Sequence, residues 1–346
     1  MKTKLLLIFV LIILISSSNY SQSSDTLFTA FYNLENLFDV IDDEGKDDAE
    51  FLPDGDNEWT AERLDRKLFN IARVIRSMNN EIGPDILGVC EVEHQYLLDT
   101  LIAKFLNDKN FKTAGYESPD NRGIENGLIY NADKFNLIGL TADTVKLSDG
   151  YPTRLVLGTA LVSNEQDTFY VFINHWPSRR GGEIQSQPNR ITAANVLRYR
   201  VDSLFALNKN SKIIIMGDFN DEPVNVSVLN TLKAQPFICD SIPLKKEITE
   251  PALYNLAFQA FQNGEGSYKF RDDWNMLDQI IVSTDLLIGE SIQYECGSFE
   301  VYKPDFVLTK SGKYIGTSFP TYGGNRYLGG YSDHFPVTAK FIFSEK

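Results

Sequence analysis

Six short segments of the chain place polar residues directly beside apolar, β-branched runs. Such runs are typical of buried strands because they are short and bounded by turn residues. The polar residues are carboxylates, carboxamides and imidazoles: Asn33 and Glu35, Glu91, Asn174 and His175, Asp218 and Asn220, Asp278, and Asp333 with His334. Sites in α/β proteins gather at strand ends, so we expect these side chains to converge at one edge of the fold.

These residue types suit a divalent metal and a phosphate ester. Carboxylates and carboxamides are hard oxygen ligands of the kind that Mg²⁺ or Mn²⁺ prefers. Glu91 is the first candidate ligand, Glu35 and Asp333 are candidates for the same or a second ion, and Asn33 is a candidate for metal-bound water or a phosphate oxygen. Hydrolysis of a phosphodiester needs an activated water, neutralised charge on the phosphate oxygens and help for the leaving oxygen.

Each of these segments also has a simpler explanation. A single strand-terminal Asp or Asn is usually a turn former. The segment Asp218 to Asp221 fits such a turn, Ser332 and Asp333 fit the capping of backbone amides, and His175, which precedes Trp176 and Pro177, fits a buried structural histidine. Six segments with one chemical theme are hard to attribute to coincidence, so we interpret them together as one site.

The same segments resemble the endonuclease/exonuclease/phosphatase superfamily. The resemblance extends from Leu27 to Phe343 and rests most specifically on Gly-Asp-Phe-Asn at 217–220 and Ser-Asp-His at 332–334. It is supported by Asn33, Glu91, Asn174-His175 and Leu-Asp-Gln-Ile at 277–280. It implies an α/β fold, a four-layered sandwich with two central mixed sheets flanked by helices. It also implies hydrolysis of phosphate esters that depends on a divalent metal.

Five residues receive catalytic roles that are similar to those in the family. Asp218 would orient or deprotonate the attacking water. Asn220, two residues on in an extended segment, would donate its amide to phosphate. His334 would stabilise the transition state as an imidazolium, with Asp278 accepting from its other ring nitrogen. His175 would meet the substrate phosphate or the leaving group.

Two arginines are candidates for contact with the substrate phosphate. Arg122 lies in a segment that resembles a family element carrying arginine toward phosphate. Arg179 precedes Gly181 and Gly182, where a guanidinium fork on a loop suits an anionic ligand. The alternative for Arg179 is a solvated basic loop.

The rest of the chain predicts one domain with strands and helices mixed along it. No repeat, low-complexity block or Pro-rich linker divides it, and this mixture favours α/β layers. Strands are expected at residues 27–32, 86–89, 127–130, 170–173, 213–216, 279–282 and 336–341, and helices at 60–78, 188–207 and 226–232. Thr60 is the expected N-cap of the first helix. The segment 317–331 should border the site.

The segment 39–58 has ten acidic residues and one Lys, which is typical of a solvated loop. Asp54, Asp56 and Asn57 suggest calcium, but no Glu closes the twelve-residue calcium motif, so an extra Ca²⁺ is not the favoured interpretation. Three cysteines are too few for a disulfide framework. Cys90 is expected in the core, and whether Cys239 and Cys296 form a bridge stays open.

The N-terminus predicts export, to the periplasm or out of the cell. Lys2 and Lys4 precede the apolar run Leu5 to Ile15 and a short polar stretch, a layout typical of a signal peptide over residues 1–22. The run is shorter than the roughly 20 residues that a membrane span needs. No stable membrane insertion is therefore expected after its removal, and residues 25–346 form the expected catalytic domain.

The net charge of the chain restricts the classes of function that are possible. The chain has 33 basic and 47 acidic residues, a net charge of -14, so a generally basic surface that captures nucleic acid is excluded. The favoured function is an exported, metal-dependent endonuclease that acts as a monomer on nucleic acid, with no protein partner. The alternatives are a phosphatase or phospholipase C of the same fold, acting on sphingomyelin or inositol phosphates, and a non-catalytic exported binding protein.

Overall fold

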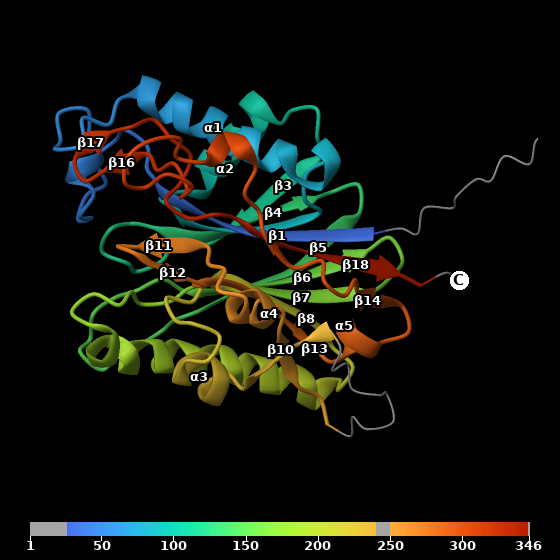
Figure 1. Cartoon of the computed structure of the whole chain (residues 1–346). Coiled ribbons are helices and arrows are strands. Elements are labelled where there is room, and N and C mark those ends of the chain that lie inside the picture. Colours follow the sequence, from blue (N-terminus) through green and yellow to red (C-terminus); the bar gives the residue numbers. More distant parts are fainter. Residues whose placement is uncertain (1–25, 240–249, 345–346) are drawn as a thin grey trace, which may run out of the picture.

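The computed structural model describes residues 26–239 and 250–344. Two large β-sheets lie face to face, with helices on both outer faces (Figure 1). Helices α1 (Ala61–Glu81) and α2 (Gln95–Phe105) cover the first sheet, and α3 (Glu183–Leu207) covers the second. This arrangement confirms the predicted four-layered α/β sandwich. The predicted signal peptide, residues 1–22, lies outside the described residues.

Both sheets are mixed, as predicted. In the first sheet β1 pairs parallel with β2 and antiparallel with β18, and in the second β7 pairs parallel with β8. The first sheet has the order β14 (Ile292–Tyr294), β18 (Val337–Phe343), β1 (Thr26–Leu37), β2 (Ile86–Val92), β4 (Glu125–Asn131), β3 (Phe111–Gly115), with β15 (Glu300–Val301) beside β18. The second has the order β5 (Phe135–Asp143), β6 (Val156–Ser163), β7 (Thr168–His175), β8 (Lys212–Asp218), β13 (Asp278–Ser283), β10 (Leu253–Asn255), β9 (Ala234–Pro236).

Shorter elements connect these layers. Two hairpins stand apart from the sheets, β11 (Tyr268–Phe270) with β12 (Asp273–Asn275), and β16 (Tyr322–Gly323) with β17 (Arg326–Tyr327). The short helices are η1 (Ala49–Phe51), η2 (Ser227–Thr231), α4 (Phe258–Gln262), α5 (Asp285–Ile288) and η4 (Asp305–Val307). None of the described helices is long and apolar enough to cross a membrane.

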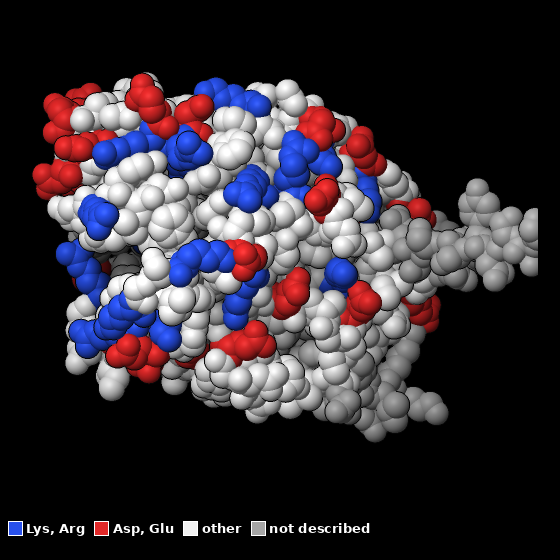
Figure 2. Space-filling view, turned by 45° about the horizontal axis from the view of Figure 1, so that its top comes forward, with Lys and Arg blue, Asp and Glu red and all other residues white. Residues whose placement is uncertain are grey.

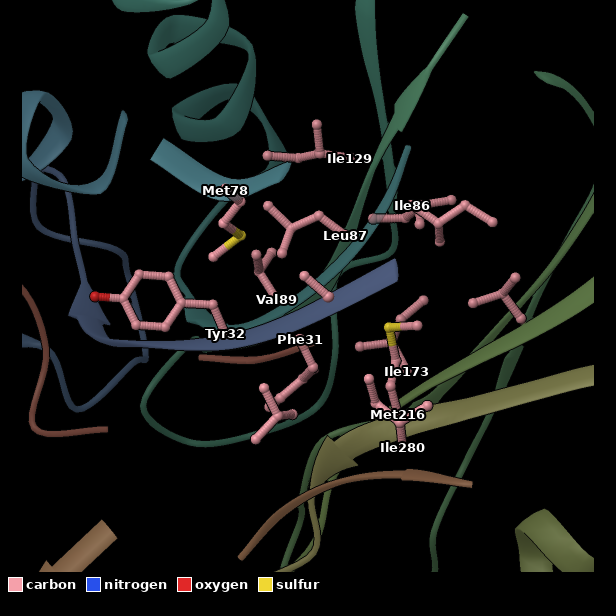
Figure 3. Packing of buried hydrophobic residues seen from close by; sticks show 14 of the residues in the cluster. Phe31, Tyr32, Met78, Ile86, Leu87, Val89, Ile129, Ile173, Met216 and Ile280 are labelled. Atoms are coloured by element: carbon pink, nitrogen blue, oxygen red, sulfur yellow. The ribbon is translucent and has the colours of Figure 1, made fainter. Parts of the chain in front are cut away.

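The main core lies between the two sheets. Figure 3 shows Phe31 and Ile86 of the first sheet on one side and Ile173, Met216 and Ile280 of the second on the other. Each of these side chains is fully buried, and burial of such a side chain stabilises the fold by about 1.5–3 kcal/mol. The core therefore fixes the two sheets against each other and, with them, the strand ends that carry polar residues.

One glycine lets the sheets approach closely. A Cβ atom at Gly88 would lie 2.6 Å from the sulfur of Met216 and 3.1 Å from Ile173. Those distances are shorter than van der Waals contact allows, so a side chain at 88 would require the Met216 and Ile173 side chains to move. The strand β2 that contains Gly88 also carries Glu91.

The predicted helix at 60–78 is confirmed. Helix α1 begins at Ala61, and the Thr60 side chain accepts a hydrogen bond from the Arg63 amide at 3.4 Å. Its last residues leave helical geometry from Met78 onward. Helix α3 begins five residues before the predicted start at Pro188, and the predicted helix at 226–232 is the short η2.

The acidic segment 39–58 is more than the solvated loop expected from its composition. Phe51 stacks on Phe38 with ring centroids 4.2 Å apart, and Trp59 is fully buried beside them. Asp48 is also buried and accepts a hydrogen bond from the Asp43 amide. The apolar residues at both ends of the segment fold it into a small satellite core, which composition alone did not indicate.

The cysteines divide into a pair and a single residue. Cys239 and Cys296 form a disulfide, with their Cα atoms 5.6 Å apart. Cys90 is free and fully buried, as expected for a core residue.

Glu125, at the start of β4, should make stability depend on pH. Burial raises the pKa of this carboxyl group to about 7, and neither of its oxygens has a hydrogen-bond partner among the described residues. The unfolded chain loses this proton near the ordinary pKa of 4.5. The folded state is therefore penalised increasingly as pH rises through this window, and fully above it.

We expect Glu125→Gln to remove that penalty. The difference in unfolding free energy between the variant and the wild type should increase in the variant's favour by about 1–3 kcal/mol from about pH 4.5 to about pH 8. Urea denaturation at both pH values measures this gain, and Glu300→Gln reports what an exposed carboxylate contributes. An equal difference at both pH values would contradict the assignment.

Candidate active site

The polar residues at the strand ends meet where the two sheets adjoin. Strand β8 lies between β7 and β13, so Asp218 is in register with both His175 and Asp278. From the first sheet, Asn33 of β1 lies in register with Cys90, immediately before Glu91. Sheet register thus brings residues that are far apart in sequence to one edge, as predicted.

Two irregularities in the first sheet aim its side chains at this edge. The β1–β2 register shifts between Asn33 and Leu37, where Glu35 and Asn36 have φ values of 51° and 53°. Glu91 has φ 60° at the corresponding shift between β2 and β4. Left-handed backbone is unfavourable for such residues and is found at bulges that redirect a side chain.

Asn33 connects the two sheets. Its Nδ2 donates to Asp218 Oδ2 at 3.1 Å and to Glu91 Oε1 at 3.4 Å. Its Oδ1 accepts from the Glu35 amide at 2.9 Å, which fixes the orientation of the carboxamide. The other oxygen of Glu91 accepts from the Asn36 amide at 3.0 Å. Glu91 and Asp218 are thereby held on either side of one carboxamide.

His334 and Asp278 form a buried pair. The imidazole Nδ1 lies 2.7 Å from Asp278 Oδ2, and Nε2 lies 3.8 Å from Asp218 Oδ2. Tyr268 stacks on the ring with centroids 4.5 Å apart. Burial alone lowers the pKa of His334, but Asp278 and Asp333 outweigh it and hold the pKa well above its usual value. The imidazole is therefore positively charged at neutral pH.

The acidic groups carry more negative charge than their protein neighbours neutralise. Burial raises the pKa of Asp333, and the nearby carboxylates Glu35 and Glu91 raise it further. Burial likewise raises the pKa of Asp218, against the charge of His334. Carboxylates gathered in this way are stabilised by a divalent cation, so the donor set fits one. Glu91 and Asp333 are the residues that would hold it, whereas Asn33 presents its donor Nδ2 to Glu91 and Asp218 and orients them.

His175 differs from His334 in its charge. It is buried, with Nε2 3.7 Å from Glu91 Oε1 and 3.9 Å from Asp218 Oδ2. Burial and the cations Arg154 and Arg122 hold its pKa well below the usual value. A neutral imidazole therefore faces the carboxylates, and its Nδ1 has no hydrogen-bond partner among the described residues.

Glu35 lies at the site but has structural contacts. Its two carboxylate oxygens accept from the backbone amides of Thr321 at 2.6 Å and Tyr322 at 3.2 Å. The buried ammonium of Lys67 lies 3.5 Å away and also donates to the Tyr331 carbonyl. These contacts attach the segment 317–331 to β1, at the border of the site where it was predicted.

The segment after β8 is not extended, contrary to the geometry expected for Asn220. Asn220 has φ 50°, and its side-chain amide donates to the Trp176 carbonyl at 3.0 Å. The turn forms because the Asp218 carboxylate accepts the Asn220 amide at 2.9 Å. Asn220 therefore lies beside Asp218 through a local turn and not through strand periodicity.

The two arginines differ in their surroundings. The guanidinium of Arg179 is taken up by protein groups, donating to the Asn220 carbonyl at 2.8 Å and to the side chains of Asn225 and Asn275. The side chain of Arg122 is 40% exposed, and its nearest carboxylate is Asp120 at 3.6 Å. Arg122 is thus the more accessible of the two cations.

Sequence reasoning missed three residues that support this site, Arg154, Ser267 and Tyr268. Arg154 donates to the carbonyls of His175 and Trp176. Ser267 donates to Asp278, and Tyr268 stacks on His334. Ser332 donates to the Asn33 carbonyl and accepts from the His334 amide. Ser332 was identifiable from its place in the Ser-Asp-His motif, whereas the other three lie in segments with no chemical pattern.

A second acidic group lies outside the site. Asp39, Glu93 and His94 have ligand atoms within 4.8 Å of one another. His94 is also held between Asp43 and Glu117 at 3.1 Å each. These ion pairs account for His94 as a structural residue.

A four-layered sandwich with a charged His–Asp pair beside gathered carboxylates is the arrangement of a metal-dependent phosphoesterase. A sequence profile of the Endonuclease/Exonuclease/phosphatase family matches residues 28–344, and the chain belongs to this family. Members of the family hydrolyse phosphoester bonds and depend on a divalent metal. None of the curated proteins compared with the chain matches it.

Solved structures share the fold at low sequence identity. The human Nocturnin catalytic domain with bound sulfate anion is 16% identical, over 93% of this chain and 97% of that one, with a TM-score of 0.54. A mannosyl-6-phosphatase of Bacteroides thetaiotaomicron is 17% identical over 92% and 100%, with a TM-score of 0.56. TDP2 of D. rerio, complexed with a single-strand DNA product, is 14% identical over 91% and 98%, with a TM-score of 0.53.

Proposed function

We propose that this chain is an exported endonuclease that hydrolyses phosphodiester bonds with Mg²⁺ or Mn²⁺. The observation that carries the proposal is the position of Asp218, which lies 3.8 Å from His334 Nε2 and shares the carboxamide of Asn33 with Glu91. Asp218 as a base, His334 as a cation and Glu91 as a candidate metal ligand thus lie close together. Phosphodiester hydrolysis requires these three functions together.

Each residue has a part in the proposed reaction. Asp218 accepts a proton from the attacking water, while Asn33 fixes the orientation of the carboxylate. His334 stabilises the negative charge that develops on the phosphate, and Asp278 keeps the imidazole charged and oriented. The neutral His175 and the side chain of Asn220 lie beside Asp218, where they orient the phosphate or the leaving oxygen.

A bound Mg²⁺ would neutralise phosphate charge and lower the pKa of its bound water. Glu91 is its first proposed ligand, with Asp333 beside it. Glu35 contributes by holding the segment 317–331 in place, and Arg122 by attracting the phosphate.

The function is tested with small substrates. We expect the purified chain from Gln22 onward to hydrolyse bis(p-nitrophenyl) phosphate with Mg²⁺ or Mn²⁺ and to prefer this diester to p-nitrophenyl phosphate. Millimolar EDTA should abolish turnover, and excess Mg²⁺ should restore it. Turnover that resists EDTA, or a preference for the monoester, would contradict the proposal and favour the phosphatase alternative.

The position of cleavage is tested with a substrate that has no ends. Covalently closed circular DNA is cut only by an endonuclease, so nicking of a plasmid by the wild type and its loss in Asp218→Asn are the expected results. Digestion of linear DNA with the circle left intact would make the enzyme an exonuclease.

Export is supported by the leader layout of residues 1–22 and by the disulfide Cys239–Cys296, because disulfides persist in oxidising compartments. We expect the full chain, expressed in a Gram-negative host, to appear outside the cytoplasm without its leader. Cell fractionation with N-terminal sequencing measures this. Retention of Met1 in a cytoplasmic product would contradict export.

A further inference from the structure

A broad groove leads away from the site. Its volume is about 1340 Å³, and both Asp333 and Tyr268 lie in its wall, so it opens next to His334. Ligand pockets for single small molecules measure about 300–1,000 Å³. The groove therefore suits an extended ligand that continues beyond the reacting phosphate.

Cationic side chains line this groove from three separate parts of the chain. Helix α1 contributes Arg66 and Arg73, the β11–β12 hairpin contributes Lys269 and Arg271, and the C-terminal segment contributes Lys310 and Lys313. Figure 2 shows Lys and Arg side chains around a hollow at the left of the molecule, the side where β11, β12, β16 and β17 lie. Among the described residues that line the groove, Asp333 is the single carboxylate.

Several of these cations are not neutralised by the protein. Within the described parts of the chain, Arg66, Lys269 and Arg271 have no carboxylate within ion-pair distance, whereas Lys310 lies 2.7 Å from Asp305. The chain as a whole has a net charge of -14. The cations of the groove are therefore concentrated on a chain that is acidic as a whole. They repel one another, and an anionic ligand relieves the repulsion.

Exposed aromatic rings lie among these cations. Phe270 is 55% exposed, Tyr314 53% and Phe69 45%, and all three line the groove. The guanidinium of Arg271 lies 5.2 Å from the ring of Phe270, and the ammonium of Lys313 lies 5.5 Å from that of Tyr314. Exposed rings beside cations form a surface on which unpaired bases stack while phosphates are neutralised.

From these features we infer that the groove binds a single-stranded stretch of polynucleotide next to the phosphate that is cleaved. This inference rests on the proposed phosphodiesterase function and specifies its substrate. A duplex keeps its base faces stacked inside and leaves the rings unused, and an inositol phosphate offers no base to stack. Single-stranded DNA or RNA uses both the cations and the rings.

The groove is rigidly connected to the reacting groups. Glu35 and Lys67 attach the segment 317–331 to β1 and α1, and β1 carries Asn33. Tyr268, which also lines the groove, stacks on His334. A strand held in the groove is therefore positioned relative to Asp218 without movement of the site.

The test measures equilibrium binding with no turnover. Fluorescence anisotropy of labelled dT₁₂ and of a 12-base-pair duplex is recorded with the mature chain in EDTA, at several salt concentrations. We expect at least about tenfold tighter binding of dT₁₂ than of the duplex. Lys269→Ala/Arg271→Ala should weaken dT₁₂ binding about tenfold or more and reduce the salt slope by about 0.7 for each phosphate that is no longer neutralised.

Two further variants test whether binding depends on the aromatic rings as well as on charge, and whether the cations must lie in the groove. Phe270→Ala/Tyr314→Ala, which changes no charge, should weaken dT₁₂ binding about tenfold or more while leaving the salt slope unchanged. Lys112→Ala/Lys209→Ala removes two exposed cations outside the groove and should bind like the wild type. Circular dichroism verifies that each variant is folded.

Three results would overturn the inference: duplex binding as tight as that of dT₁₂, ring variants that bind normally, or equal losses in the Lys112/Lys209 control. Tighter binding of inositol hexakisphosphate than of dT₁₂ would also overturn it. Turnover of bis(p-nitrophenyl) phosphate, which is too small to occupy the groove, should persist in all groove variants. If the wild type binds dT₁₂ through the groove but does not hydrolyse this diester, the proposed function fails while the binding site stands.

Discussion

Replacement of His334 by glutamine should lower kcat for bis(p-nitrophenyl) phosphate by about 10³–10⁴-fold, the largest loss expected for a single substitution in this chain. Glutamine retains a hydrogen-bond donor but no positive charge. The loss therefore reports on the charge that Asp278 and Asp333 maintain on the imidazole. Steady-state kinetics at saturating Mg²⁺ measures it.

Asp278→Asn tests the same charge through its partner. The Asp278 carboxylate raises the pKa of His334, so its removal lowers that pKa, and the imidazolium is lost at a lower pH. The alkaline limb of the kcat–pH profile should consequently move toward lower pH, a shift that general destabilisation would not produce. His94→Gln, on a histidine held by Asp43 and Glu117 outside the site, is the matched control and should retain turnover. Near-normal kcat in His334→Gln would remove the imidazolium from the reaction.

Glu91→Gln should raise the Mg²⁺ concentration that gives half-maximal activity by about 10–100-fold or more. Metal-ligand and neighbouring substitutions have effects of this size, and glutamine keeps the shape of the side chain while removing its charge. Titration of activity with Mg²⁺ gives the shift. Calorimetric titration with Mn²⁺ gives it without turnover.

Glu58→Gln is the control for this experiment. Its carboxylate is 74% exposed in the acidic segment 39–58, away from the site. An unchanged titration is expected for it. If both variants titrate like the wild type, Glu91 is not a ligand, and if both are weakened, the acidic segment contributes to metal binding.

The sequence predicted the architecture well where periodic patterns were long. The apolar run at 213–216 becomes the centre of β8, and Thr60 caps α1 as expected. Strand ends were less accurate, because β1 continues to Leu37 through an irregular stretch at Glu35 and Asn36. A left-handed residue that is not glycine leaves no mark on local hydrophobic periodicity. For the same reason the turn at Asn220 was taken as extended.

The edge strands and one helix were not predicted at all. Strand β5 is half-exposed and alternates irregularly, and α2 presents a short apolar stripe. Such elements are stabilised by their neighbours and less by their own propensity. Their position therefore depends on contacts with the central strands.

By itself, the sequence determined which residue types carry the chemistry and that they stand at the ends of buried strands. Composition and spacing along the chain are local properties, so Asp218, Asp278 and His334 were identifiable without a structure. The leader layout and the net charge of -14 are determined in the same way.

Only the tertiary structure decided what surrounds those residues. In the folded chain the Glu35 carboxylate accepts hydrogen bonds from the amides of Thr321 and Tyr322, nearly 290 positions away. The guanidinium of Arg179 is enclosed by protein contacts. The tertiary structure also joined cations of α1, the β11–β12 hairpin and the C-terminal segment into one groove. Charge and hydrogen bonding act over a few ångströms in space, whatever the separation along the chain, so these relations exist only once the two sheets have packed.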